Sequence, residues 1–163
     1  MAETDYVISG VMIKKSGLID LRETYRLMKE WFFQRRYDFI EKEYNDRDFD
    51  DGKNIFIKWS SEKKVDDYTK MIIDITFKGS KLEDVKVGNK NLLKGNVSIL
   101  FESYVYKDYE DNWEKNPVSK FIREVFDKFI IKQHFDKIHK DLKAETYAIF
   151  DEVKKYLKAV KYD

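Results

Sequence analysis

Apolar and polar residues alternate along most of the first two thirds of the chain, a pattern that predicts β-strands with one buried face. Such runs are found at 6–15, 37–47, 55–60, 71–77, 82–87 and 97–106. Turn-forming residues separate them at Ser16-Gly17, 48–52, 63–66 and 88–95. Strands joined by such short connections form antiparallel sheets. For residues 37–44 the alternative is a continuation of the preceding helix.

Two segments have helical periodicity instead. Asp20 and Glu23 have the spacing of a capping box at the start of the first. The second begins at Asn116-Pro117, an N-cap followed by a proline suited to the first turn, and continues to about residue 160 without Gly or Pro. The order β-α-β-β-β-β-β-α predicts a single α+β domain over residues 1–163. Its N-terminal helix and long C-terminal helix, about 117–160, lie on one face of an antiparallel β-meander.

The long helix changes its apolar face partway along. From Ile131 onward the apolar stripe is turned by roughly 130° relative to the stripe that ends at Ile130. The second stripe is interrupted at Glu145-Thr146. A straight helix of this length spans about 66 Å, whereas a compact domain of this size has a radius of gyration of about 15 Å. The helix therefore either overhangs the domain or breaks within residues 130–135.

The second stripe has two interpretations: it packs inside the domain on the helix of residues 20–35, or part of it meets another chain. The second interpretation predicts a contact with a protein partner or a second copy. Trp113, which lies outside the stripe, is also predicted to contact a partner because Tyr and Trp are frequent interface anchors. The predicted partner-binding residues are Ile131, Phe135, Ile138, Leu142, Ile149, Val153, Tyr156 and Trp113.

The charge balance argues against a nucleic-acid-binding protein. Lys and Arg number 32 and Asp and Glu number 31, so the net charge is +1 and no strong field of one sign surrounds the chain. A local basic patch is compatible with this balance. The absence of Cys excludes disulfides and thiolate metal sites. No targeting pattern is visible, and no apolar run approaches the ~18 residues of a transmembrane helix. We therefore expect a cytoplasmic protein.

Candidates for metal or catalytic chemistry are weak. His134 and His139 lie five residues apart, whereas zinc pairs on a helix need a spacing of three or four. Asp46, Asp48 and Asp50 resemble a calcium loop without the glycine and glutamate that such a loop needs. No glycine-rich phosphate loop is present. We expect no metal, no cofactor and no identifiable catalytic residue, although an acid–base pair among the many carboxylates stays open.

Two stretches of the chain resemble known sequences. They are Tyr6-Val7-Ile8-Ser9-Gly10 with Ser16-Gly17-Leu18-Ile19-Asp20, and residues 107–117 (KDYEDNWEKNP) with Lys120-Phe121-Ile122-Arg123. Together they resemble a group of small uncharacterised archaeal proteins from lineages with reduced genomes, over nearly the whole chain. The resemblance implies an archaeal origin and assigns no activity or catalytic residue.

The pattern as a whole favours a non-catalytic scaffold or protein-interaction domain, either self-assembling or part of a complex. The alternative is a binding module for an apolar small molecule or lipid. A curved antiparallel sheet covered by a long C-terminal helix resembles START-like helix-grip domains, which hold such ligands between sheet and helix. This alternative rests on architecture alone, which does not determine function.

Overall fold

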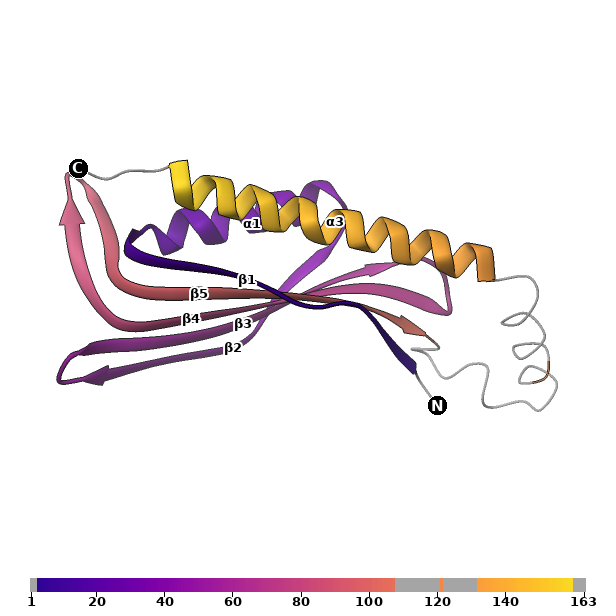
Figure 1. The fold of residues 1–163 in the computed structure, drawn as a ribbon, viewed down its shortest axis with the longest axis horizontal. Coiled ribbons are helices and arrows are strands. Elements are labelled where there is room, and N and C mark those ends of the chain that lie inside the picture. The colour runs from indigo at the N-terminus through magenta and orange to yellow at the C-terminus, as the bar shows by residue number, and fades with distance from the viewer. Residues whose placement is uncertain (1–2, 108–120, 122–131, 160–163) are drawn as a thin grey trace.

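The chain folds into a five-stranded antiparallel sheet with two helices on one face (Figure 1). The computed structural model describes residues 3–107, Phe121 and residues 132–159. Strand order in the sheet is β1-β5-β4-β3-β2. The elements are β1 (Glu3–Ile19), α1 (Leu21–Gln34), β2 (Asp38–Phe49), β3 (Gly52–Lys64), β4 (Thr69–Val87), β5 (Lys90–Lys107) and α3 (Lys132–Ala159).

The predicted α+β class is confirmed, but the predicted order β-α-β-β-β-β-β-α contains one strand too many. The segments 71–77 and 82–87 belong to the single strand β4. They are joined by a bulge, seen as a register shift between Ser80 and Glu83. The predicted turn at Ser16-Gly17 is also wrong, because both residues pair with β5 as part of β1. Polar and glycine residues inside long paired strands were mistaken for a turn in β1 and for a boundary between two strands in β4.

The start of α1 follows the predicted capping pattern in part. The Asp20 carboxylate accepts a hydrogen bond from the Glu23 backbone N–H at 3.0 Å, which satisfies one of the unpaired donors of the first turn. The Glu23 side chain pairs with Arg26 at 2.8 Å. Arg36 adopts a left-handed conformation (φ 65°) just after the helix. The chain then enters β2, so residues 38–49 form a strand and not a continuation of α1.

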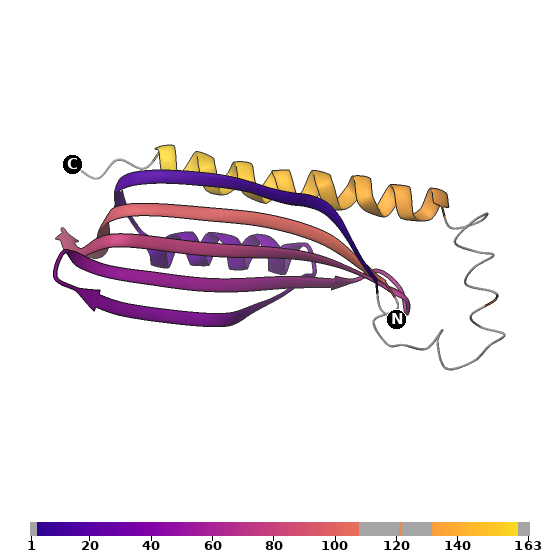
Figure 2. The same ribbon diagram turned by 60° about the horizontal axis from the view of Figure 1, so that its bottom comes forward.

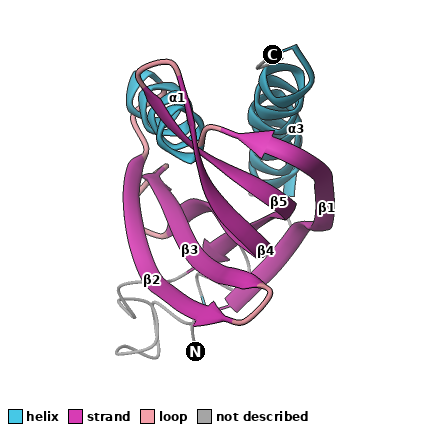
Figure 3. Ribbon diagram, turned by 90° about the vertical axis from the view of Figure 1, so that its left-hand side faces the viewer, coloured by secondary structure: helices cyan, strands magenta, loops and turns pink. Residues whose placement is uncertain are grey.

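Both helices cover the same face of the sheet (Figures 2 and 3). On this face, buried apolar side chains of the three central strands pack against α1 and α3. We call the opposite face, which no described helix covers, the open face. The fully buried residues with the largest side chains on the covered face are Trp59, Phe77 and Phe101 from the sheet and Phe32 from α1. The main core cluster thus lies between the sheet and the helices.

The bulge in β4 bends one end of the sheet. Lys81 is left-handed there (φ 53°), and the ends of β4 and β5 curve toward the helices in Figure 1. A Cβ atom at Gly95 would lie 2.6 Å from the Lys81 carbonyl oxygen, and one at Gly52 would lie 2.8 Å from the Lys81 carbonyl carbon. These approaches are closer than a side chain permits. The bend therefore depends on glycine at both neighbouring positions.

Candidate functional site

The apolar stripe of α3 packs against the sheet of its own chain. The predicted partner-binding residues that the structure buries are Phe135, Ile138, Leu142, Ile149 and Val153. Tyr156 is half-buried, and Leu157, which was not predicted, is buried beside it. A partner could reach these side chains only if α3 left the sheet. Their role in partner binding stays a prediction.

The other residues predicted for the long helix lie partly outside the described residues. Ile131 and Trp113 lie outside them, as do the predicted start at Asn116-Pro117 and most of the first half of the helix. Phe121 is helical and 65% exposed. Residues 132–135, where a break was considered, belong to the continuous helix α3.

The two polar residues that interrupt the stripe both have partners. Thr146 is fully buried, and its hydroxyl donates to the Leu142 carbonyl oxygen at 2.6 Å. The Glu145 carboxylate accepts a hydrogen bond from the Tyr37 hydroxyl and lies 3.6 Å from Lys63 Nζ. Burial, reinforced by the Glu145 carboxylate, raises the pKa of Tyr37, so its hydroxyl keeps the proton that it donates. The interruption therefore ties α3 to β3 and to the segment after α1.

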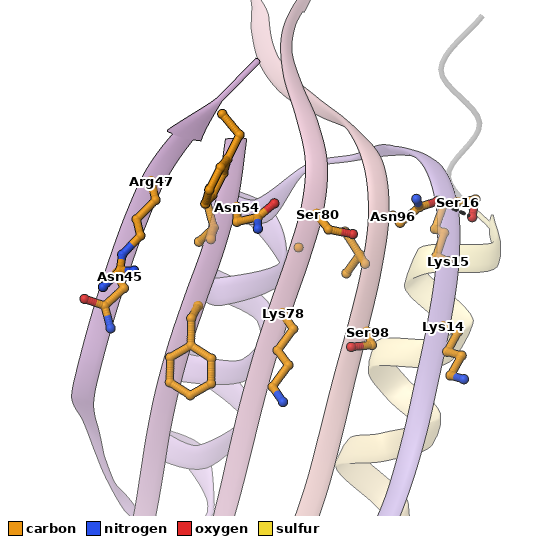
Figure 4. A pocket seen from close by; sticks show the side chains of 15 residues that line it. Lys14, Lys15, Ser16, Asn45, Arg47, Asn54, Lys78, Ser80, Asn96 and Ser98 are labelled. Carbon is orange, nitrogen blue, oxygen red and sulfur yellow. Dashed lines mark hydrogen bonds between the residues drawn. The ribbon is translucent and has the colours of Figure 1, made fainter. Parts of the chain in front are cut away.

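A groove of about 680 Å³ lies on the open face, and all five strands contribute to it (Figure 4). Four basic residues line it: Lys14, Lys15, Arg47 and Lys78. No carboxylate is among the lining residues. Polar amides and hydroxyls fill most of the remaining positions. The groove is therefore positively charged, although the whole chain is nearly neutral.

Two neighbouring cross-strand rows form the groove. The row that we call the ring row contains, in order across β2, β3, β4, β5 and β1, Asn45, Phe56, Lys78, Ser98 and Lys14. The row that we call the amide row contains, on the same strands, Arg47, Asn54, Ser80, Asn96 and Ser16. Because side chains on a strand alternate between faces, each row presents its members to one side of the sheet. Short serines between longer side chains leave the space that makes the groove.

The alternation of residues in β2 separates opposite charges. Arg47 and Phe49 line the groove, whereas Asp46 and Asp48 occupy the alternate positions, whose side chains belong to the other face. On that other face the hydrogen bond to Asp84 raises the pKa of Lys53, and Asp46 adds to the effect. The negative charges that balance Arg47 in the sequence are thus directed away from the groove.

Three of the four cations are available at the surface. Lys14, Arg47 and Lys78 are exposed. Lys15 is half-buried, its Nζ donates to the Leu157 carbonyl oxygen at 2.6 Å, and burial lowers its pKa. Lys15 therefore anchors the end of α3, and the other three carry the charge of the groove.

The far end of the open face has the opposite sign. There Asp74 lies opposite Glu102 in the register of β4 and β5, and Asp38 lies opposite Glu62 in that of β2 and β3. One cation, Lys70, forms an ion pair with Glu62 at 3.2 Å, so acidic side chains remain in excess at this end. Burial, followed by the charge of Asp74, raises the pKa of Tyr104 on the same end. The open face is therefore divided into a basic end and an acidic end.

A second groove, of about 420 Å³, lies between α1 and the covered face of the sheet. Its apolar lining comes from Leu21, Tyr25, Ile57, Trp59 and Leu93. Arg22, Glu41 and Asn91 add polar groups. The predicted helix-grip site lies between the sheet and the C-terminal helix, where the stripe of α3 is packed into the core. This groove is instead beside the N-terminal helix.

The residues weighed for metal binding do not come together. Asp46 and Asp48 lie on β2, and His134 forms a contact of 3.3 Å with Asp66. Within residues 3–107 and 132–159, no group of three or more His, Asp or Glu side chains is placed to hold a metal ion. In the same part of the chain, neither helix has the length and apolarity needed to cross a membrane.

Comparison with known proteins does not assign the chain to a family. No protein-family model matches the chain, and no curated protein matches it. The resemblance to small archaeal proteins therefore stays a prediction.

Sequence analysis missed every residue of the open-face groove. One usable signal was the run Asn45-Asp46-Arg47-Asp48-Phe49, in which period-two alternation separates acids from the other residues. The remaining residues come from four other strands, and only the register of the sheet places them together.

Proposed function

We propose that this chain is a non-catalytic binding domain that holds an anionic ligand in the groove on the open face of its sheet. The observation that carries the proposal is the separation of charge: three exposed basic side chains and no carboxylate line the groove of a chain with a net charge of +1. A concave site lined by charges of one sign concentrates the field and attracts ions of the opposite sign.

The scaffold suits binding. The cations stand on paired strands, so their backbone positions are fixed before a ligand arrives, which lowers the entropy lost on binding. The Ser16 hydroxyl donates to the Asn96 side chain at 2.9 Å, which orients that amide. Amide and hydroxyl groups both donate and accept hydrogen bonds. The groove therefore offers an anion both charge and directed polar contacts.

The test is a titration of the labelled protein with inorganic tripolyphosphate. Binding is monitored through the amide resonances of the protein in NMR spectra. We expect the largest changes at 14–16, 45–49, 54–56, 78–80 and 96–98. The double variant Arg47→Gln, Lys78→Gln should weaken binding by about tenfold or more, because it removes two of three exposed cations. Lys140→Gln, Lys143→Gln makes the same change in net charge on α3 and should bind as the wild type. Equal losses in both variants, or no change in the groove resonances, would refute the proposal.

The apolar-ligand alternative is favoured by one observation, the groove between α1 and the sheet. Trp59 lines it, so a ligand that enters should change tryptophan fluorescence. If the domain holds such ligands, a fatty acid or a planar apolar dye should bind in this groove and change the fluorescence. Unchanged fluorescence of Trp59, isolated by Trp31→Phe and Trp113→Phe, would count against this second function.

A further inference from the structure

We propose that the anion held on the open face is single-stranded nucleic acid, with a base stacked on Phe56 and the backbone phosphates on Lys14, Arg47 and Lys78. This inference rests on the proposed function and names its ligand. Sequence-tolerant binding of single strands combines basic side chains that follow the backbone with aromatic rings on which bases stack. The groove contains both components.

The aromatic component is placed on the surface among the cations. Phe56 is half-buried in the ring row, and Phe49, at 53% exposed, lines the groove from β2. The Lys78 ammonium lies 5.9 Å from the centre of the Phe56 ring. Lys78 is exposed, so a base can take its place over the ring while the ammonium pairs with a phosphate. Neither ring belongs to the core cluster between the sheet and the helices.

The polar component matches the edges of bases and sugars. Asn54 offers an amide donor and acceptor in the groove, and Asn96, whose oxygen accepts from Ser16, offers its amide donor. The Asn45 amide donates to the Glu43 carboxylate at 2.9 Å and leaves its oxygen as an acceptor. Serine hydroxyls lie between them in the two rows. Ribose adds a 2′-hydroxyl that such groups can bind, so RNA and DNA are distinguishable here by experiment.

The charges also define a path. The ring row crosses all five strands, a distance of four interstrand spacings or about 19 Å. Along the strands, the acidic end begins with Asp74 and Glu102, which repel phosphates. The strand of nucleic acid therefore runs across the sheet, along the two rows, and the binding site is short.

The experiment measures binding of the protein to labelled oligonucleotides of about 8 nucleotides by fluorescence anisotropy. Four ligands of the same length are compared: single-stranded RNA, single-stranded DNA, abasic single-stranded DNA and a duplex. We expect single strands that carry bases to bind about tenfold or more tightly than abasic DNA and than duplex, since both lack a base free to stack. Three phosphate contacts predict a slope of log Kd against log salt of about 2, and Lys14→Gln should lower it by about 0.7.

Phe56 is tested with matched variants. Phe56→Leu should weaken binding about 5- to 100-fold, and Phe56→Trp should restore it. Phe33→Leu removes an exposed ring on α1 and should leave binding unchanged. The melting temperature of each variant shows whether the fold is intact. The salt dependence of binding by Lys14→Gln provides a second test of the site that leaves every apolar residue unchanged.

The outcomes separate the two proposals. Equal affinity for abasic and base-containing strands, or tighter binding of polyglutamate than of any oligonucleotide, overturns the nucleic-acid assignment. The proposed function survives that result if tripolyphosphate still shifts the groove resonances. If neither tripolyphosphate nor oligonucleotides bind the groove, both proposals fail.

Discussion

Leu142→Ala tests whether the stripe of α3 belongs to the core or to an interface. Leu142 is 0% exposed and lies in the middle of α3. The substitution removes about three carbon groups, each worth about 0.8 kcal/mol when buried, and leaves a cavity that the neighbours fill only in part. We expect a loss of about 3 kcal/mol in the free energy of unfolding. This is a large fraction of the about 5–15 kcal/mol typical of a single domain.

The assay is urea denaturation followed by circular dichroism. With a denaturant dependence of about 2 kcal/mol per molar urea, the midpoint should fall by about 1.5 M. Lys143→Ala, at the exposed neighbouring position, should leave the midpoint within about 0.3 M because alanine is a good helix former. Sedimentation velocity on the same samples measures assembly. If Leu142→Ala kept its midpoint and instead dissociated an oligomer, the stripe would be an interface, and our placement of it in the core would be wrong.

Two further predictions concern the sheet. Gly95→Ala should lower the free energy of unfolding by about 2 kcal/mol because its Cβ would meet backbone at the bulge of β4. In the control Gly10→Ala, the new Cβ would lie 3.3 Å from one leucine methyl group, and the free energy of unfolding should change by less than about 1 kcal/mol. If thermal denaturation showed equal losses for the two variants, the bulge would not be tightly packed. Ser103→Ala should raise the free energy of unfolding by up to about 1 kcal/mol, because its fully buried hydroxyl has no hydrogen-bond partner among the described residues. A decrease of similar size would indicate that this hydroxyl binds a buried water.

Local patterns predicted the class of the fold well. Alternation in β3 and in the first part of β4 gave their buried faces, and Asp20 marked the start of α1. These signals depend on neighbours in sequence. The bulge at Lys81 was mistaken for a boundary between two strands because its cause, close packing of Gly52 and Gly95 from other strands, is not local.

The difference between local and non-local signals also explains why the groove was not predicted from the sequence. The stripe containing Leu142 was visible because a helix gathers its face from one segment, yet the sequence did not show what covers that face. The groove was invisible because Lys14, Phe56 and Lys78 meet only through the register of three strand pairs. A net charge summed over the chain conceals a basic groove when the balancing acids lie on another surface.

The position of β1 at the edge of the sheet, paired with β5, has a consequence for folding. Glu3 lies opposite Lys107 and Ile19 opposite Leu93, so the first strand to be synthesised waits for the last. At a synthesis rate of about 5–20 residues per second, this delay is on the order of ten seconds. The hairpins of β2 to β5 form from neighbouring segments, whereas docking of β1 must close a long loop, which is slow. We expect the apolar side chains of β1 to stay exposed in the nascent chain until β5 is complete, and its docking to limit the folding rate.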